Sequence, residues 1–290
     1  MSKRFLCCLA IIAAGCTAAA FLLAHSGFIR FTRPSAPPPA PPAELTVVLV
    51  PLDSRPPCTQ FVEQLGRLAG VRVLLPPPRL LDNYRAPADR AGLRDWLQSA
   101  AKTADAAIVS VDMLTHGGLL ASRLSAGSAA DAEAVLALLT ALHAGNPRLK
   151  IYAFNIIPRL LAADGSVGAR FQKNLLKYSI LKDEVLTFEN PREREKLDKL
   201  AAHIPPAVVD RYLGLYEANT QYNFRLMALA EKGVLSALVF GQDDGHPFGL
   251  PNMVKDRLEH YVNHRPALAE RVFITRGTDE VALTLLGRLA

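Results

Sequence analysis

The feature that most constrains the fold is a series of short apolar runs, rich in branched residues, that alternate with stretches of helical periodicity. Six runs are predicted as strands, at residues 45–52, 71–76, 105–113, 149–157, 236–244 and 271–277. They are continuously apolar, which is typical of parallel strands covered on both faces. The sequence therefore predicts an α/β domain with a parallel sheet and flanking helices, either an open doubly wound sheet or an incomplete β/α barrel.

Two segments precede this predicted domain, which spans residues 45–290. Residues 1–32 begin with two basic residues and continue with an apolar run long enough to cross a bilayer as a helix. We expect an N-terminal membrane anchor, with a cleaved signal or lipidation at Cys16 as the alternatives. Residues 33–44 are proline-rich and predict a stiff polyproline spacer. Together they predict an extracytoplasmic domain tethered to the cell membrane.

Several classes of protein are disfavoured by what the sequence lacks. The net charge of +6 is spread along the chain without a basic run, so we expect no nucleic-acid partner. Cys58 is the one cysteine outside the N-terminal segment, which excludes a disulfide within the domain. There is no phosphate-binding P-loop, dinucleotide fingerprint, zincin motif or serine nucleophile elbow. The sequence therefore requires no cofactor, although a divalent metal stays an open alternative.

Polar residues follow most of the predicted strands at the point where each strand ends. Carboxyl ends of parallel strands meet at one edge of a sheet, where ligands bind in α/β folds. We therefore expect these residues to lie close together: Asp53, Arg55, Asp112, Asn155, Asp243, Asp244, Asp279 and Glu280.

A second group of candidates forms the loop "SVDMLTHGGLLASR" at residues 110–123. Asp112 ends a strand, His116 precedes two glycines, and Arg123 closes the loop. The Gly117–Gly118 pair permits a tight turn or a close approach of the backbone to a ligand.

Acids at such an edge suit three kinds of chemistry. They can act as an acid/base pair on a glycosidic bond, or bind a cation through Asp53, Asp112 and Asp243 with a histidine assisting. They can also bind sugar hydroxyls without catalysis. The structural alternative is that the acids cap helices, as Asp279 could, or pair with arginines. Acids consumed in this way would favour a noncatalytic binding protein.

The sequence also resembles a known family. The motifs "VVLVPLDSRPPC", "LLPPPRLL", "IVSVDMLTHGGLLASR", "LVFGQDDGHPFG" and "GTDEVALTLLGR" occur in the order of the bacterial DUF4127 family, and "YLGLYEANTQYNFRLM" resembles its asparagine-rich helix. The resemblance covers about Leu45 to the end. It implies that the motif residues form a site, but supplies no activity. His116 stands where the family pattern has a tyrosine, and the resemblance implies a member truncated at its C-terminus.

From these observations we expect a hydrolase that acts on a carbohydrate or cell-wall glycan. The predicted catalytic residues are Asp243, Asp244 and Asp112. The predicted substrate-binding residues are Asp53, Arg55, His116, Gly117, Gly118, Arg123, Asn155, Asn219, Asn223, His246, Asp279 and Glu280. A metal-dependent hydrolase and a noncatalytic glycan- or protein-binding envelope protein are the alternatives.

Overall fold

The computed structural model describes residues 45–84, 86–124, 128–161, 169–243 and 245–290. The predicted anchor at 1–32, the predicted linker at 33–44 and the candidate Asp244 therefore lie outside the described residues. Among the helices that the structure describes, each is too short or too polar to cross a membrane.

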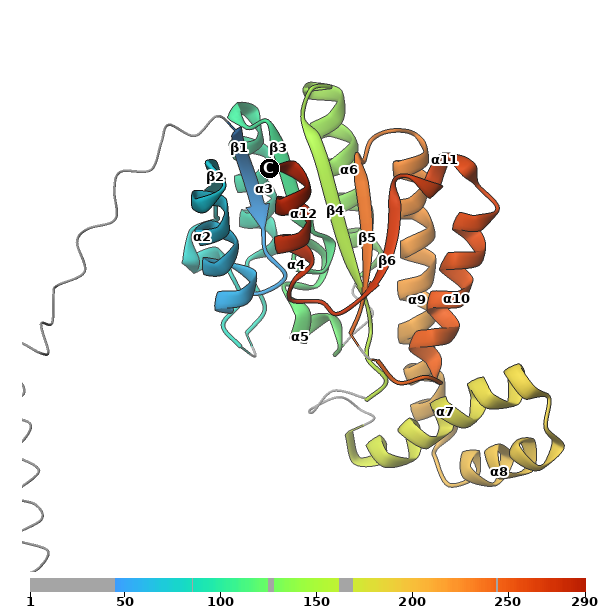
Figure 1. The fold of residues 1–290 in the computed structure, drawn as a ribbon. Coiled ribbons are helices and arrows are strands. Elements are labelled where there is room, and N and C mark those ends of the chain that lie inside the picture. Colours follow the sequence, from blue (N-terminus) through green and yellow to red (C-terminus); the bar gives the residue numbers. More distant parts are fainter. Residues whose placement is uncertain (1–44, 85, 125–127, 162–168, 244) are drawn as a thin grey trace, which may run out of the picture. The chain divides into compact units, whose positions relative to one another are not determined.

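The core of the domain is one sheet of six parallel strands (Figure 1). The strands are β1 (Leu45–Val50), β2 (Val71–Leu74), β3 (Ala106–Ser110), β4 (Lys150–Ile157), β5 (Ala237–Gln242) and β6 (Val272–Arg276). Each lies within one of the six apolar runs, so the prediction of a parallel α/β sheet is confirmed.

The strand order excludes the barrel alternative. The strands are arranged as β2-β1-β3-β4-β5-β6, so β1 lies between β2 and β3. In a β/α barrel, consecutive strands are neighbours throughout, whereas here the chain first steps outward to β2 and then crosses back to β3. The sheet is therefore open. The strand order reverses between β1 and β3, the point where open α/β sheets form a crevice at their carboxyl ends.

Helices cover both faces of this sheet (Figure 1). The α-helices are α2 (Gln60–Leu68), α3 (Arg90–Ala100), α4 (Val111–His116), α5 (Leu119–Ser122), α6 (Ala129–Gly145), α7 (Gln172–Phe188), α8 (Pro191–Ala201), α9 (Pro206–Glu231), α10 (Leu250–Asn263), α11 (Pro266–Ala269) and α12 (Val281–Leu289). Short 3-10 turns lie at Pro56–Cys58, Pro78–Leu80, Ala101–Thr103 and Ala169–Phe171.

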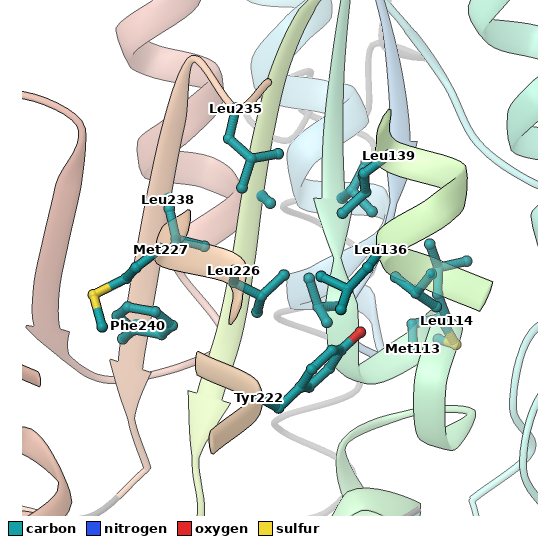
Figure 2. Packing of buried hydrophobic residues seen from close by; sticks show 14 of the residues in the cluster. Met113, Leu114, Leu136, Leu139, Tyr222, Leu226, Met227, Leu235, Leu238 and Phe240 are labelled. Atoms are coloured by element: carbon teal, nitrogen blue, oxygen red, sulfur yellow. The ribbon is translucent and has the colours of Figure 1, made fainter. Parts of the chain in front are cut away.

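Strand β1 shows why its apolar run is continuous. Val48 and Val50 belong to the hydrophobic cluster beneath α3, α6, α9 and α10, whereas Val47 and Leu49 belong to the cluster beneath α2 and α12. Successive side chains of a strand point to opposite faces, so a strand buried on both sides needs apolar residues at every position. Figure 2 shows part of the first cluster, in which labelled residues of α6, α9 and β5 face one another: Leu136, Leu139, Leu226, Met227, Leu238 and Phe240.

The connection from β6 to α12 leads from the edge of the sheet to the face that α2 covers. β6 is an edge strand, yet α12 packs against α2 and against β3 and β4 (Figure 1). The crossing passes close to Gly241 in β5. A Cβ at Gly241 would lie 2.7 Å from the carbonyl oxygen of Gly277 on this connection, so a larger residue would force the two segments apart. The crossing carries Asp279 toward the loop that follows β1.

Candidate functional site

The first polar group at the carboxyl edge joins the β1 loop to the β6–α12 connection. Asp53 is buried and accepts hydrogen bonds from the Arg55 backbone amide at 3.0 Å and from Arg55 Nε at 2.8 Å. The same guanidinium donates from Nη1 and Nη2 to the two oxygens of Asp279, at 3.0 and 2.6 Å. The hydrogen bond to Asp53, with that to Asp279, raises the pKa of Arg55 above its usual value. We call Asp53, Arg55 and Asp279 the Arg55 clasp.

The clasp decides between the two alternatives for Asp279. Its carboxylate binds Arg55 and accepts from the Thr278 hydroxyl at 3.2 Å, and the N-cap residue of α12 is Glu280. Of the two structural alternatives for Asp279, pairing with an arginine is therefore the one observed, and capping of the last helix is not. Glu280 makes no side-chain capping hydrogen bond to α12, and its carboxylate lies over Gly277.

A buried thiol, Cys58, lies behind the clasp. One ligand atom each from Asp53, Cys58 and Asp279 lies within 4.8 Å of the others. Burial, with the charge of Asp53, raises the pKa of the Cys58 thiol, which disfavours a thiolate ligand. Because Arg55 hydrogen-bonds both carboxylates, the group forms an ion-pair cluster rather than an open cation site. Among the residues that the structure describes, the expected metal set of Asp53, Asp112 and Asp243 does not come together.

The second polar group surrounds Asp112, in the first turn of α4. Asp112 is 1% exposed, and its carboxylate accepts a hydrogen bond from the Ile156 backbone amide at 2.7 Å. The Ser122 side chain interacts with the same carboxylate, while its hydroxyl donates to the Leu119 carbonyl oxygen at 2.8 Å. Burial, reinforced by the charge of Asp243, raises the pKa of Asp112 to about 7, against the opposing effect of these hydrogen bonds. Asp112 is therefore a carboxyl group that exchanges a proton near neutral pH.

Asp243, after β5, is paired with Arg123 at the end of α5. Arg123 Nη2 donates to Asp243 Oδ2, and both side chains are largely buried, 15% and 11% exposed. The Nε atom of Arg123 is buried without a hydrogen-bond partner in the described structure. We call Asp112, Ser122, Arg123 and Asp243 the Asp112 centre. It joins two of the predicted motifs, whereas their third acid, Asp244, lies outside the described residues.

A ladder of asparagine side chains connects the Asp112 centre to α9. Asn155 Nδ2 donates to Asn223 Oδ1 at 2.7 Å, and Asn223 Nδ2 donates to Asn219 Oδ1 at 2.9 Å. Asn219 Nδ2 then donates to the Ile156 carbonyl at 3.0 Å. The Ile156 amide binds Asp112, so this residue joins the ladder to the centre. Asn155 and Asn223 are buried, which makes them supports of the site and leaves Asn219 as the member able to meet a ligand.

A pocket of about 230 Å³ opens beside the centre, between α4, α5, the start of α6 and α9. Its lining is rich in hydroxyl and amide groups, those of Thr115, Ser122, Ser128, Asn219, Gln221 and Tyr222, and also includes the imidazole of His116 and the guanidinium of Arg225, which binds Glu133. The apolar lining residues are Ala129, Ala132, Pro158, Leu215 and Ala218. Ser122 belongs to both the pocket and the Asp112 centre. This pocket thus provides neutral hydrogen-bonding groups next to a titratable acid.

His116 lines this pocket at the end of α4. Burial, with the positive charge of Arg90, lowers the pKa of His116 to about 4, so the imidazole is neutral at pH 7. Its Nδ1 atom is buried without a hydrogen-bond partner in the described structure. A neutral imidazole in this position suits hydrogen bonding to a polar ligand better than binding of an anion.

Three other predicted substrate-binding residues have local structural roles. Gly117 has φ +90°, and a Cβ there would lie 2.8 Å from the Ala88 amide nitrogen; at Gly118, φ is +123°. These two glycines make the turn between α4 and α5. His246 is exposed, and its Nδ1 lies 2.7 Å from the Phe248 carbonyl oxygen in its own turn. The two glycines are required by backbone conformation, whichever ligand the site binds.

Sequence reasoning missed several residues around the pocket. Tyr222 is buried on α9, and its hydroxyl lies 3.2 Å from the Thr115 hydroxyl. Ser122 belongs to the predicted loop at residues 110–123, but no role was predicted for it. Tyr222 follows Asn219 by three positions, which places both on one face of α9, so helical spacing from the asparagine was the available signal.

The fold and the site define an open α/β domain with a polar centre at the carboxyl edge of a parallel sheet. The family model described as "Protein of unknown function (DUF4127)" matches residues 47–290, and the chain belongs to that family. A comparison with curated proteins gives no match. Among solved structures, the chain is similar to "Thioesterase Domain From Curacin Biosynthetic Pathway" at 13% identity, over 85% of this chain and 90% of that chain, with a TM-score of 0.33. That similarity is too low to support an argument.

Proposed function

We propose that the domain is a hydrolase that acts on a carbohydrate bound in the pocket beside the Asp112 centre. The observation that carries this proposal is the position of Asp112, a buried carboxyl group with a pKa of about 7, linked through Ser122 to a pocket lined by hydroxyls and amides. A carboxylic acid that is protonated near neutral pH is what general-acid catalysis of glycoside cleavage needs.

The composition of the pocket favours a neutral, hydroxyl-rich substrate. Ser122, Asn219 and Tyr222 offer donors and acceptors in a small concave space, and Pro158 and Leu215 supply apolar surface. Sugars present the same combination of hydroxyl edges and apolar ring faces. The pocket volume of about 230 Å³ suits a single residue of a glycan rather than a long segment.

The proposed roles follow from charge. Asp112 would give its proton, through the Ser122 hydroxyl, to the leaving oxygen as the glycosidic bond breaks. Asp243, held by Arg123, would remain a carboxylate and stabilise the positive charge that develops at the anomeric carbon. Water would add its hydroxyl to that carbon and return its proton to the carboxylate of Asp112. The outcome at the anomeric carbon depends on which face the water attacks.

The predicted membrane tether is the second basis for a glycan substrate. We propose that residues 1–32 hold the domain at the outer face of the cell membrane, where cell-wall glycans are available. Fractionation of cells that produce the full chain would test this location independently of any activity. Recovery of the chain in the cytoplasm would contradict it.

The test of the function is release of reducing ends from a panel of cell-wall and storage oligosaccharides by the full chain. The Asp112→Asn variant should lose at least about 100-fold in kcat/KM, the usual scale for a removed general acid. Asp183→Asn is the matched control, because Asp183 is also a buried carboxyl with a raised pKa that accepts a backbone hydrogen bond, from Gly249 at 2.7 Å, but lies outside the pocket. Equal activity of Asp112→Asn and wild type would overturn the proposal.

A noncatalytic glycan-binding protein is the second candidate. It is favoured by the ion pairs, because Asp53, Asp243 and Asp279 are all bound by arginines. This alternative predicts saturable binding of an oligosaccharide without turnover, and equal affinity in wild type and Asp112→Asn. Calorimetry on the oligosaccharide panel distinguishes the two candidates.

A further inference from the structure

Two exposed histidines stand one helical turn apart at the end of α10. His260 lies in the last turn of the helix and His264 is its C-cap residue, and their ring centroids are 4.1 Å apart. Histidines at positions i and i+4 lie on the same side of a helix, which allows both rings to bind one metal ion.

The hydrogen bonding of His264 fixes which of its nitrogens is available. Its Nδ1 lies 2.7 Å from the His260 carbonyl oxygen. A carbonyl oxygen can only accept, so Nδ1 carries the hydrogen and Nε2 carries the lone pair. Metal-binding histidines commonly donate their other nitrogen to a backbone carbonyl, because this fixes the tautomer and the ring orientation. His264 thus has the arrangement of a metal ligand.

The surface around the pair carries charges of both signs, and the acid that lines the groove, Asp256, is paired with Lys255 at 3.1 Å. The last carbonyl groups of a helix carry partial negative charge, and α10 runs for 14 residues from Leu250 to Asn263. Asp256, one turn before His260, lines the same surface groove. The two arginines of this groove have partners: Arg257 Nη1 donates to Glu217 at 2.7 Å, and the Arg265 guanidinium lies 3.6 Å from the centre of the Tyr261 ring.

We propose that His260 and His264 form a surface site for one divalent transition-metal ion of the Cu²⁺, Ni²⁺ or Zn²⁺ type. Two imidazole nitrogens would bind the metal, and water would complete its coordination from the open groove, whose volume is about 570 Å³. Imidazole ligands select these metals over Mg²⁺ and Ca²⁺, which prefer oxygen. The site is separate from the Asp112 centre and does not depend on the proposed hydrolase activity.

Calorimetric titration of the tag-free chain with CuCl₂, NiCl₂, ZnCl₂ and MgCl₂ tests the site. We expect one equivalent of Cu²⁺ to bind, with weaker binding of Ni²⁺ and Zn²⁺ and none of Mg²⁺. His264→Ala should weaken Cu²⁺ binding about 10-fold or more, because one of two ligands is lost. The electron paramagnetic resonance spectrum of the copper-loaded wild type should show coupling to two imidazole nitrogens.

The matched control is His203→Ala, two residues after the end of α8. His203 is also exposed, and its Nδ1 lies 2.7 Å from the carbonyl oxygen of Lys199, four residues earlier, as in His264. The residue four positions before His203 is Lys199, whereas the residue four positions before His264 is a second histidine, His260. Replacing His203 should therefore leave the Cu²⁺ affinity unchanged. Equal loss of affinity in both variants, or no binding by wild type, would overturn the proposal. Circular dichroism of His264→Ala verifies that α10 remains folded.

Discussion

The Arg55 clasp and the Asp112 centre contain the same kinds of group, but their carboxylates interact with different kinds of partner. In the clasp, Asp53 and Asp279 both receive hydrogen bonds from the charged guanidinium of Arg55. In the centre, Arg123 binds Asp243, whereas the groups that interact with the carboxylate of Asp112 are neutral: the Ile156 amide, which donates to it, and the Ser122 side chain.

The identity of the donor explains which acid can exchange a proton. A charged donor offsets the loss of solvation when a carboxylate is buried, and so keeps it ionised. Neutral donors offset less of this lost solvation, so the pKa of Asp112 rises to about 7. A clasp whose two acids bind one guanidinium suits a structural role, and a carboxyl that titrates near neutrality suits chemistry.

The largest expected effect comes from removing Arg123, the arginine that pairs with Asp243 in the Asp112 centre. Arg123→Met would leave Asp243 buried without its cation, and we expect a loss of about 3–5 kcal/mol in the free energy of unfolding. Urea denaturation at pH 7 measures it. Arg123→Lys keeps the charge and should lose much less. A loss below about 1 kcal/mol in Arg123→Met would show that Asp243 does not depend on the arginine.

The next effect concerns Asp112 and pH. Because its folded pKa is raised from 3.8 to about 7, the folded state holds a proton that the unfolded state releases. The contribution of Asp112 to stability is therefore complete below about pH 4 and is lost as pH rises through about 7, by on the order of 4 kcal/mol. Asp112→Asn should remove this dependence. Parallel pH profiles of wild type and variant would contradict the assignment.

A smaller effect is expected from the Arg55 clasp. Arg55→Met removes the partner of two acids, but the Arg55 side chain is 49% exposed and that of Asp279 is 35% exposed. Water can solvate Asp279, and the backbone amide of residue 55 still donates to the buried Asp53, so we expect a loss of about 1–2 kcal/mol in the free energy of unfolding. A double-mutant cycle with Asp279→Asn isolates the coupling between these two residues. A coupling near zero would mean that Asp53 alone holds Arg55.

The smallest effect separates the two sites by their response to salt. Raising NaCl from 0.05 to 0.5 M should weaken the half-exposed Arg55–Asp279 pair by a few tenths of a kcal/mol, because exposed ion pairs are screened. The largely buried Arg123–Asp243 pair should change less. Double-mutant cycles at both salt concentrations measure this difference. An equal response would show that water reaches both pairs alike.

The sheet could be predicted from the sequence because its signal is local. The six strands are continuous apolar runs, and burial on both faces explains that pattern. The strand order could not be predicted from the sequence, because the apolar runs do not indicate which strands are neighbours in the sheet. The barrel alternative survived for this reason, and only the position of β1 between β2 and β3 excludes it.

The candidate site was predictable in its residues but not in its pairings. Parallel strands place Asp112 and Asp243 at the same edge, as expected, and pairing of the acids with arginines was among the predicted alternatives. The pairing of Arg123 with Asp243 spans 120 residues and that of Arg55 with Asp279 spans 224. Such contacts depend on how the helices and connections cross the sheet, which no local pattern encodes.

The crossing from β6 to α12 has a consequence for how the domain is made in the cell. Arg55 leaves the ribosome 224 residues before Asp279, which corresponds to roughly 10–45 s of synthesis. During that interval the loop after β1 has Arg55 and Asp53 in place but not the second acid. The loop therefore closes only after Asp279 has been synthesised, and a nascent chain stalled before Asp279 would present it open to chaperones and proteases.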